Sequence, residues 1–123
     1  MARVLALVPD LLFGSNLQGT LTAAGNDVEM LGGEAALRER LGDEDAPAAH
    51  VLVVDLTDPD LDGSGILAAL LAEGELTAIH TLGYYSHVDA LAREHAEEAG
   101  FELVVPRSRM AREGASLIAR LAR

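Results

Sequence analysis

Short hydrophobic runs recur along the chain at intervals that suit buried strands. The runs RVLALV, HVLVVD and FELVV are almost continuously apolar, which is typical of strands buried on both faces of a parallel sheet. DVEML and TAIHTLGYY are weaker candidates, the second because Gly83 interrupts it. The pattern therefore predicts strands at 3–8, 27–31, 50–55, 77–85 and 101–105.

Amphipathic stretches fill the gaps between the expected strands. Ser15 is the expected N-cap of a first helix that carries Leu17 and Leu21, and Gly25 stands where a C-terminal cap belongs. Gly100 is expected to end the fourth helix. The four later helices are predicted at 32–42, 64–74, 86–100 and 108–123.

The last two predicted helices each show an apolar periodicity. The fourth is expected to begin at Ser86 or His87, and the residues that recur along it at helical spacing are Val88, Leu91, His95 and Ala99. The inward face expected for the fifth is Leu117, Ile118 and Leu121. Within the fourth strand we expect His80 to be a hydrogen-bonded sheet residue and Tyr84 or Tyr85 to belong to the core.

Strict alternation of strands and helices predicts the fold class. It indicates one α/β domain over residues 1–123, with a parallel sheet, right-handed crossovers and helices on both faces. Five strands favour the flavodoxin-like order 2-1-3-4-5. Ligands of such sheets bind at the carboxyl ends of the strands, near the first and third. Here those ends are Pro9, Asp10 and Asp55.

Composition narrows the classes of function. With 9 Lys plus Arg against 20 Asp plus Glu, the net charge is −11, which argues against nucleic acid as a partner because phosphate backbones are bound by basic patches. The chain has no cysteine, and no apolar run approaches the roughly 20 residues that cross a bilayer. We expect a cytoplasmic protein with no membrane contact, and not an enzyme.

The loop sequence VVDLTDPDLDGSG concentrates acidic residues after the third strand. Asp58, Asp60, Asp62 and Gly63 match the start of a calcium loop, but Ala69 stands where that loop needs a bidentate glutamate. The three aspartates are better interpreted as a solvated loop that caps the third helix.

The spacing of Asp55, Pro59 and Gly63, after a buried strand, resembles the receiver domain of two-component response regulators, and the likeness runs the length of the chain. The resemblance implies that Asp55 is a phosphoacceptor and that Ser86, or Tyr85, and Arg107 contact the phosphoryl group. It also implies a magnesium site formed by Asp10, Asp55 and the Thr57 carbonyl.

Three positions depart from the family pattern. Pro9 stands where one acid of an acidic pair is expected, Arg107 replaces a lysine, and Val104 occupies the place of an aromatic switch residue. Mg²⁺ binding should therefore be weak, because Mg²⁺ needs several oxygen ligands, and the planar guanidinium of Arg107 is no substitute for a compact ammonium. Alternatively Asp55 has only a structural role and pairs with Arg107.

Our leading hypothesis is a stand-alone, atypical receiver domain that acts through protein–protein contact, with phosphorylation at Asp55 impaired. A constitutive pseudo-receiver that is never phosphorylated is the alternative, and a small-ligand-binding flavodoxin-like protein is a third. Expected partners are a histidine kinase or a downstream signalling protein.

The fourth and fifth helices, through which receivers often pair, suggest a homodimer, since one is rich in glutamate and the other in arginine. Ser86, His87 and Asp89 are too close in sequence to form a hydrolase triad.

Overall fold

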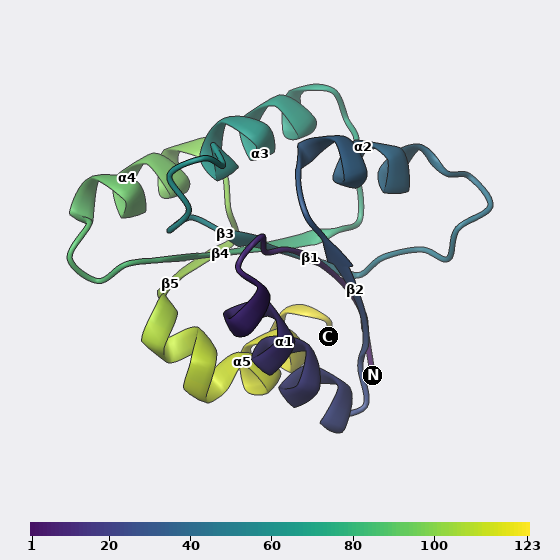
Figure 1. The fold of residues 1–123 in the computed structure, drawn as a ribbon. Coiled ribbons are helices and arrows are strands. Elements are labelled where there is room, and N and C mark those ends of the chain that lie inside the picture. The colour runs from purple at the N-terminus through teal and green to yellow at the C-terminus, as the bar shows by residue number, and fades with distance from the viewer.

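The computed structural model describes all 123 residues as a five-stranded parallel sheet covered by helices on both faces (Figure 1). The strand order is β2-β1-β3-β4-β5, which confirms the predicted flavodoxin-like topology. The elements are β1 (Arg3–Leu7), α1 (Leu11–Ala23), β2 (Asp27–Leu31), α2 (Glu34–Gly42), β3 (Val51–Asp55), α3 (Gly63–Ala72), β4 (His80–Tyr85), α4 (Ala90–Ala99), β5 (Leu103–Pro106) and α5 (Arg107–Leu121).

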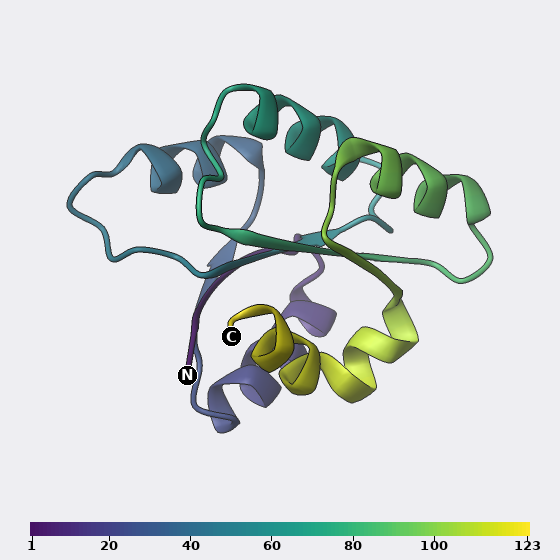
Figure 2. The ribbon, with the colours of Figure 1, turned by 180° about the vertical axis from the view of Figure 1, so that it is seen from behind.

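The sheet separates two hydrophobic cores. Helices α1 and α5 cover one face, and α2, α3 and α4 cover the other (Figures 1 and 2). Alternation along β3 divides its side chains: Val51 and Val53 belong to the core under α1 and α5, whereas Leu52 and Val54 belong to the opposite core. Asp55 continues the alternation onto the α1–α5 face. None of the helices is long and apolar enough to cross a bilayer.

Two helices begin at aspartates rather than at the predicted residues. The predicted Ser15 cap is wrong, because Asp10 is the N-cap of α1 and its Oδ1 accepts the Phe13 N–H at 3.0 Å. The predicted start at Ser86 or His87 is also wrong, since Asp89 caps α4 by accepting the Ala92 N–H at 3.0 Å. An aspartate carboxylate accepts a hydrogen bond from a free N–H of the first turn, and its negative charge interacts favourably with the positive end of the helix dipole. The two helices therefore start at these aspartates.

The apolar face expected on α4 is only partly confirmed: Ala99 is half-buried against the core, whereas Val88, Leu91 and His95 are exposed. Val88 precedes the helix and is 79% exposed, and Leu91 is 64% exposed. The buried residue of α4 is Ala96, which packs into the core beside α3. On α1 and α5 the predicted inner faces are confirmed by the burial of Leu17, Leu21, Leu117 and Ile118. The helix ends at Gly25 and Gly100 are confirmed by positive φ angles of 93° and 110°.

Several boundaries moved by a few residues. The fourth strand begins at His80 rather than at 77, and the fifth occupies Leu103–Pro106 rather than 101–105. Phe101 is therefore outside the strand, although it is buried in the α2–α3–α4 core. The last helix begins at Arg107, which makes this arginine the first residue of α5.

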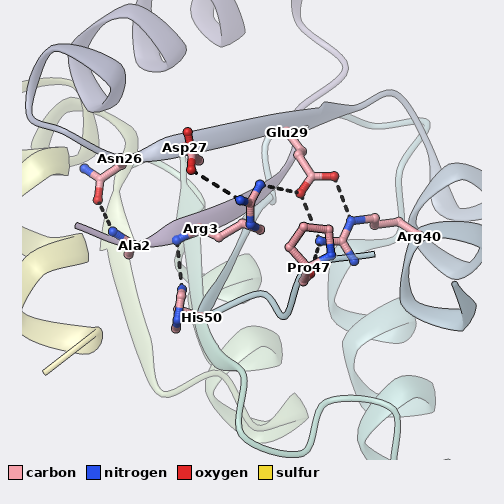
Figure 3. Close-up of polar contacts among 8 residues, drawn as sticks. All are labelled: Ala2, Arg3, Asn26, Asp27, Glu29, Arg40, Pro47 and His50. Carbon is pink, nitrogen blue, oxygen red and sulfur yellow. Dashed lines mark hydrogen bonds and ion pairs between the residues drawn. The ribbon is translucent and has the colours of Figure 1, made fainter. Parts of the chain in front are cut away.

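A polar network ties the amino ends of β1, β2 and β3 together (Figure 3). Arg40 of α2 donates to both carboxylate oxygens of Glu29, at 2.7 and 3.0 Å, and to the carbonyl of Pro47. Arg3 lies between Asp27 and Glu29, at 3.3 and 3.6 Å. The Arg3 N–H donates to His50 Nδ1 at 2.8 Å, and the Ala2 N–H donates to Asn26 Oδ1 at 3.0 Å.

Candidate functional site

Asp55 ends β3 and lies beneath the carboxyl edge of the sheet. Only 2% of the residue is exposed. Its Oδ1 accepts hydrogen bonds from the Thr57 N–H at 2.7 Å and from Thr57 Oγ1 at 2.6 Å. The parallel register places Tyr84 of β4 directly beside Asp55. The phosphoacceptor candidate is therefore a buried carboxylate whose only hydrogen-bonded partner is Thr57.

Asp10 stands across the same edge, at the end of β1, and both of its carboxylate oxygens are engaged. Oδ1 accepts the Phe13 N–H, and Oδ2 accepts a bond from Arg107 Nη2 at 3.1 Å. The pKa of Asp10 is lowered from its usual 3.8, chiefly by the Phe13 N–H; desolvation opposes this effect, and the Arg107 charge supports it. Arg107 thus pairs with Asp10, not with Asp55 as one interpretation of the sequence held.

Arg107 also belongs to a stack that runs from α5 through α1 to β4. Its guanidinium carbon lies 4.4 Å from the centre of the Phe13 ring. The Phe13 ring is tilted by 35° against that of Tyr84, with the ring centres 4.9 Å apart. A guanidinium over an aromatic face and tilted rings at this distance are both favourable. Three distant segments therefore meet beside Asp55.

Tyr84 is completely buried, and its hydroxyl makes no hydrogen bond within 3.5 Å, although the Asp55 carboxylate lies close enough to raise its pKa. Burial raises the pKa of this phenol far above its usual 10, and the neighbouring Asp55 carboxylate raises it further. An unpartnered buried hydroxyl is uncommon in a native core. The expectation that one of the two adjacent tyrosines belongs to the core is confirmed, but neither Tyr84 nor Phe13 was recognised as a site residue.

A cleft of about 570 Å³ opens above this stack. It brings together three of the predicted site residues, Thr57, Ser86 and Arg107, but Asp10 and Asp55 do not line it. The complete lining is Phe13, Thr57, Ser86, His87, Arg107, Ser108 and Ala111. The volume is within the range of small-molecule sites, and hydroxyl groups and one guanidinium dominate its chemistry.

The predicted magnesium ligands do not form a prepared metal site. Asp10 uses both oxygens for Phe13 and Arg107, Pro9 offers no side-chain donor, and one Asp55 oxygen is held by Thr57. No group of three or more acidic or histidine side chains is gathered anywhere in the protein so that it could hold an ion. Because Mg²⁺ needs closely spaced oxygen ligands, the side chains as arranged do not fit it.

The other loop aspartates have local roles. Asp62 caps α3 by accepting the Gly65 N–H at 3.0 Å, and Asp58 accepts the Asp60 N–H at 2.8 Å. The capping interpretation is therefore confirmed for Asp62. Gly63 begins α3 so close to β3 that an added Cβ would lie 2.7 Å from a methyl group of Val54. That contact explains in physical terms why a glycine follows this loop.

Two histidines and Val104 can be compared with what the sequence predicted for them. His80 of β4 lies 3.0 Å from a carboxylate oxygen of Glu102, which confirms its hydrogen-bonded role, and His87 lines the cleft beside Ser86. Val104, at the position of the family's aromatic switch, is half-buried against the core on the opposite face. The aromatic residue beside Asp55 is Tyr84 of β4, on which Phe13 of α1 packs.

The architecture is thus that of a flavodoxin-like α/β protein with its polar cleft at the carboxyl edge. No protein-family model matches the sequence, and no curated protein matches it.

The chain does resemble solved receiver domains. The receiver domain of the TMAO respiratory system response regulator TorR superposes with a TM-score of 0.83 at 19% identity, over 98% of this chain and 96% of that one. The Francisella response regulator 1452 receiver domain gives 0.79 at 16%, over 99% and 97%.

The Mn²⁺-bound response regulator Rcp1 gives a TM-score of 0.77 at 16% identity, over 98% of this chain and 91% of that one. With these likenesses the fold is that of a response-regulator receiver domain, as the spacing of Asp55, Pro59 and Gly63 had indicated.

Proposed function

We propose that this protein is a signalling module of receiver fold that acts through protein–protein contact and does not depend on phosphorylation of Asp55. The observation that supports this most is the Arg107–Asp10 ion pair beside a buried Asp55. The role is one of recognition and not of catalysis, in a cytoplasmic setting.

The Arg107–Asp10 ion pair bears directly on whether Asp55 can form an acyl phosphate. Phosphorylation of Asp55 would bring a dianionic group next to Asp10, and a divalent cation is needed to offset the repulsion. Asp10 is already occupied by Phe13 and Arg107. A cation that binds Asp10 would have to compete with Arg107, so we propose that the ion pair weakens cation-assisted transfer to Asp55.

Exposed apolar side chains near the cleft support a contact role. Leu11 and Leu12 are 86% and 76% exposed at the start of α1, and Val88 and Leu91 are exposed at the start of α4. All four follow strands β1 and β4 at the carboxyl edge of the sheet. They form two separate exposed pairs, one at the start of α1 and one around the start of α4, and we propose each pair as a contact point for a partner. A histidine kinase or a downstream signalling protein is the kind of partner we propose.

Self-association through α4 and α5 is part of the proposal. Glu94, Glu97 and Glu98 lie on α4, and the arginines of α5 are Arg107, Arg109, Arg112 and Arg120, with Arg123 just beyond it. Glu97 is bound within its own helix by Arg93, and Glu113 of α5 pairs with Arg109 and Arg112. These exposed pairs are weak, so they can exchange for contacts with a second copy.

Regulation by phosphorylation is the second candidate. The observation that favours it is the cleft in which Ser86 and Arg107 meet near the end of β3, since a hydroxyl and a cation there could contact a phosphoryl group on Asp55. A small anionic ligand in the same cleft would be a variant of the third interpretation of the sequence.

The test is a titration with Mg²⁺ and beryllofluoride followed by amide NMR. We expect no shift changes at Thr57 or Ser86 in the wild type at millimolar concentrations, and no difference from Asp55→Asn. Asp55→Ala should also leave self-association, measured by sedimentation, unchanged. Shift changes that Asp55→Asn abolishes would establish the phosphorylation-regulated candidate instead.

A further inference from the structure

We infer that Arg107 is the resident cation of the carboxyl-edge site, where its guanidinium takes the place that a divalent metal ion would need. The inference rests on the proposed function, because it explains why the acidic edge operates without a metal. The resemblance to receiver domains implied that Arg107 contacts a phosphoryl group. In this inference, Arg107 instead occupies the cation site itself.

The guanidinium is held from two directions. In its plane, Nη2 donates to Asp10 Oδ2 at 3.1 Å. Its central carbon also lies over the Phe13 ring, 4.4 Å from the ring centre. A planar, weakly hydrated cation suits this combination of carboxylate and aromatic face better than a metal ion does. The contact with Asp10 removes the one acid of the first loop that could have been a metal ligand.

The stack that carries the guanidinium is itself anchored. Phe13 packs on Tyr84, which is fully buried in the core under α1 and α5. On the other side, Pro106 precedes Arg107 with φ fixed at −62°. The backbone of Arg107 is thus the first turn of a 15-residue helix, so the side chain starts from a rigid position.

Acidic residues follow two neighbouring strands, β1 and β3, at the carboxyl edge. Asp55 is buried and Asp10 stands at the same edge, in a protein of net charge −11. Two neighbouring carboxylates repel each other unless a positive charge lies with them. Arg107 is the one cationic side chain bound to either carboxylate. A divalent ion at Asp10 would have to displace it and would meet its repulsion.

Removal of the guanidinium should therefore create metal affinity. We would titrate Mn²⁺ and follow the paramagnetic broadening of amide signals in four proteins: the wild type, Arg107→Ala, Pro9→Asp with Arg107→Ala, and Arg109→Ala. Arg109 is the matched control, because it lies on the same helix and pairs only with Glu113. Thermal unfolding by circular dichroism confirms that each variant is folded.

We expect no saturable broadening around Thr57 in the wild type or in Arg109→Ala. Arg107→Ala should bind Mn²⁺ at least tenfold more tightly than the wild type, and the double variant more tightly again because Pro9→Asp restores a second acid. Asp55→Asn added to Arg107→Ala should remove the gain. Equal Mn²⁺ affinity in the wild type and in both Arg107→Ala proteins would overturn the inference.

Failure of the inference is separable from failure of the proposed function. A wild type that responds to Mg²⁺ and beryllofluoride, while Arg107→Ala still gains Mn²⁺ affinity, contradicts the function and supports the resident cation. A wild type that does not respond, with no gain in either variant, supports the function and contradicts the resident cation.

Discussion

Arginine–carboxylate contacts occur at both ends of the sheet, and the two groups are built differently. At the amino end, Arg40 forms bonds to both oxygens of Glu29 and to a carbonyl, and Arg3 reaches the same glutamate (Figure 3). At the carboxyl end, Arg107 makes one bond to Asp10 and rests on an aromatic ring. The arginines at the amino end bond to neighbouring protein groups, whereas Arg107 at the carboxyl end also lines an open cleft.

The two groups differ in how completely their polar atoms are paired. Around Arg40, Nε and Nη2 both donate to acceptors within the protein. Around Arg107 a carboxylate is buried, a tyrosine hydroxyl is left without a partner, and polar side chains line an open cleft. Local departures from complete satisfaction of polar groups are expected at functional sites. The amino end thus has the arrangement of a stabilising network, and the carboxyl end is where we propose recognition.

The largest effect is expected at the amino end. Arg40→Ala removes charge-assisted bonds from a side chain that is only 13% exposed, and we expect it to lower the free energy of unfolding by about 2 kcal/mol. Urea unfolding measures the loss. Arg38→Ala is the matched control on the same helix, where the arginine pairs with Glu34 and Glu73 at the surface, and its loss should be clearly smaller. Similar losses of unfolding free energy in Arg40→Ala and Arg38→Ala would show that the Arg40 network is no more stabilising than a surface ion pair.

An effect of opposite sign is expected beside Asp55. Tyr84→Phe deletes the unpartnered hydroxyl and keeps the ring that packs on Phe13. We expect the free energy of unfolding to rise by about 1 kcal/mol, because a buried polar group without a partner is destabilising. Tyr85→Phe is the control, since the Tyr85 hydroxyl is not orphaned in this way. A loss of stability in Tyr84→Phe would show that the hydroxyl has a partner in solution.

The smallest effect is expected for Asp10→Asn, and it depends on pH. The Phe13 N–H and Arg107 lower the pKa of Asp10 in the folded state below its usual 3.8. The charge of Asp10 therefore stabilises the fold above about pH 3.9, and this contribution is lost as the pH falls through the lower folded pKa. Asparagine still caps the helix.

The wild type should accordingly be more stable than Asp10→Asn at pH 6, and the difference should be smaller at pH 3. Urea unfolding at the two pH values measures it. A gap that does not change with pH would show that the carboxylate charge of Asp10 does not contribute.

The topology could be predicted because it depends on local patterns. Continuous apolar runs such as 50–55 and the alternation with amphipathic stretches were enough for the five strands and their order. The helix starts were less accurate, since serines at 15 and 86 were chosen over Asp10 and Asp89. Competing cap residues a few positions apart cannot be ranked without knowing where the chain turns.

The site was only partly predictable. The resemblance to receiver domains implied Asp55, Ser86 and Arg107 as candidates, and the cleft brings the last two together. Arg107 stacks on Phe13, and Phe13 stacks on Tyr84. Arg107 and Phe13 are 94 positions apart in the sequence. No periodicity reports such a contact. An aromatic residue in the first turn of α1, in a chain with only two Phe and two Tyr, was the one signal that could have drawn attention to Phe13.

The proline that ends β5 also limits how the protein can assemble. β5 is an edge strand of four residues, and Pro106 has no N–H to donate to a further strand. The opposite edge, β2, is also short and carries Asp27 and Glu29. Short edges with a proline or charges resist strand addition. The sheet is therefore a poor template for cross-chain β-pairing, and partners or further copies must bind through helices and loops.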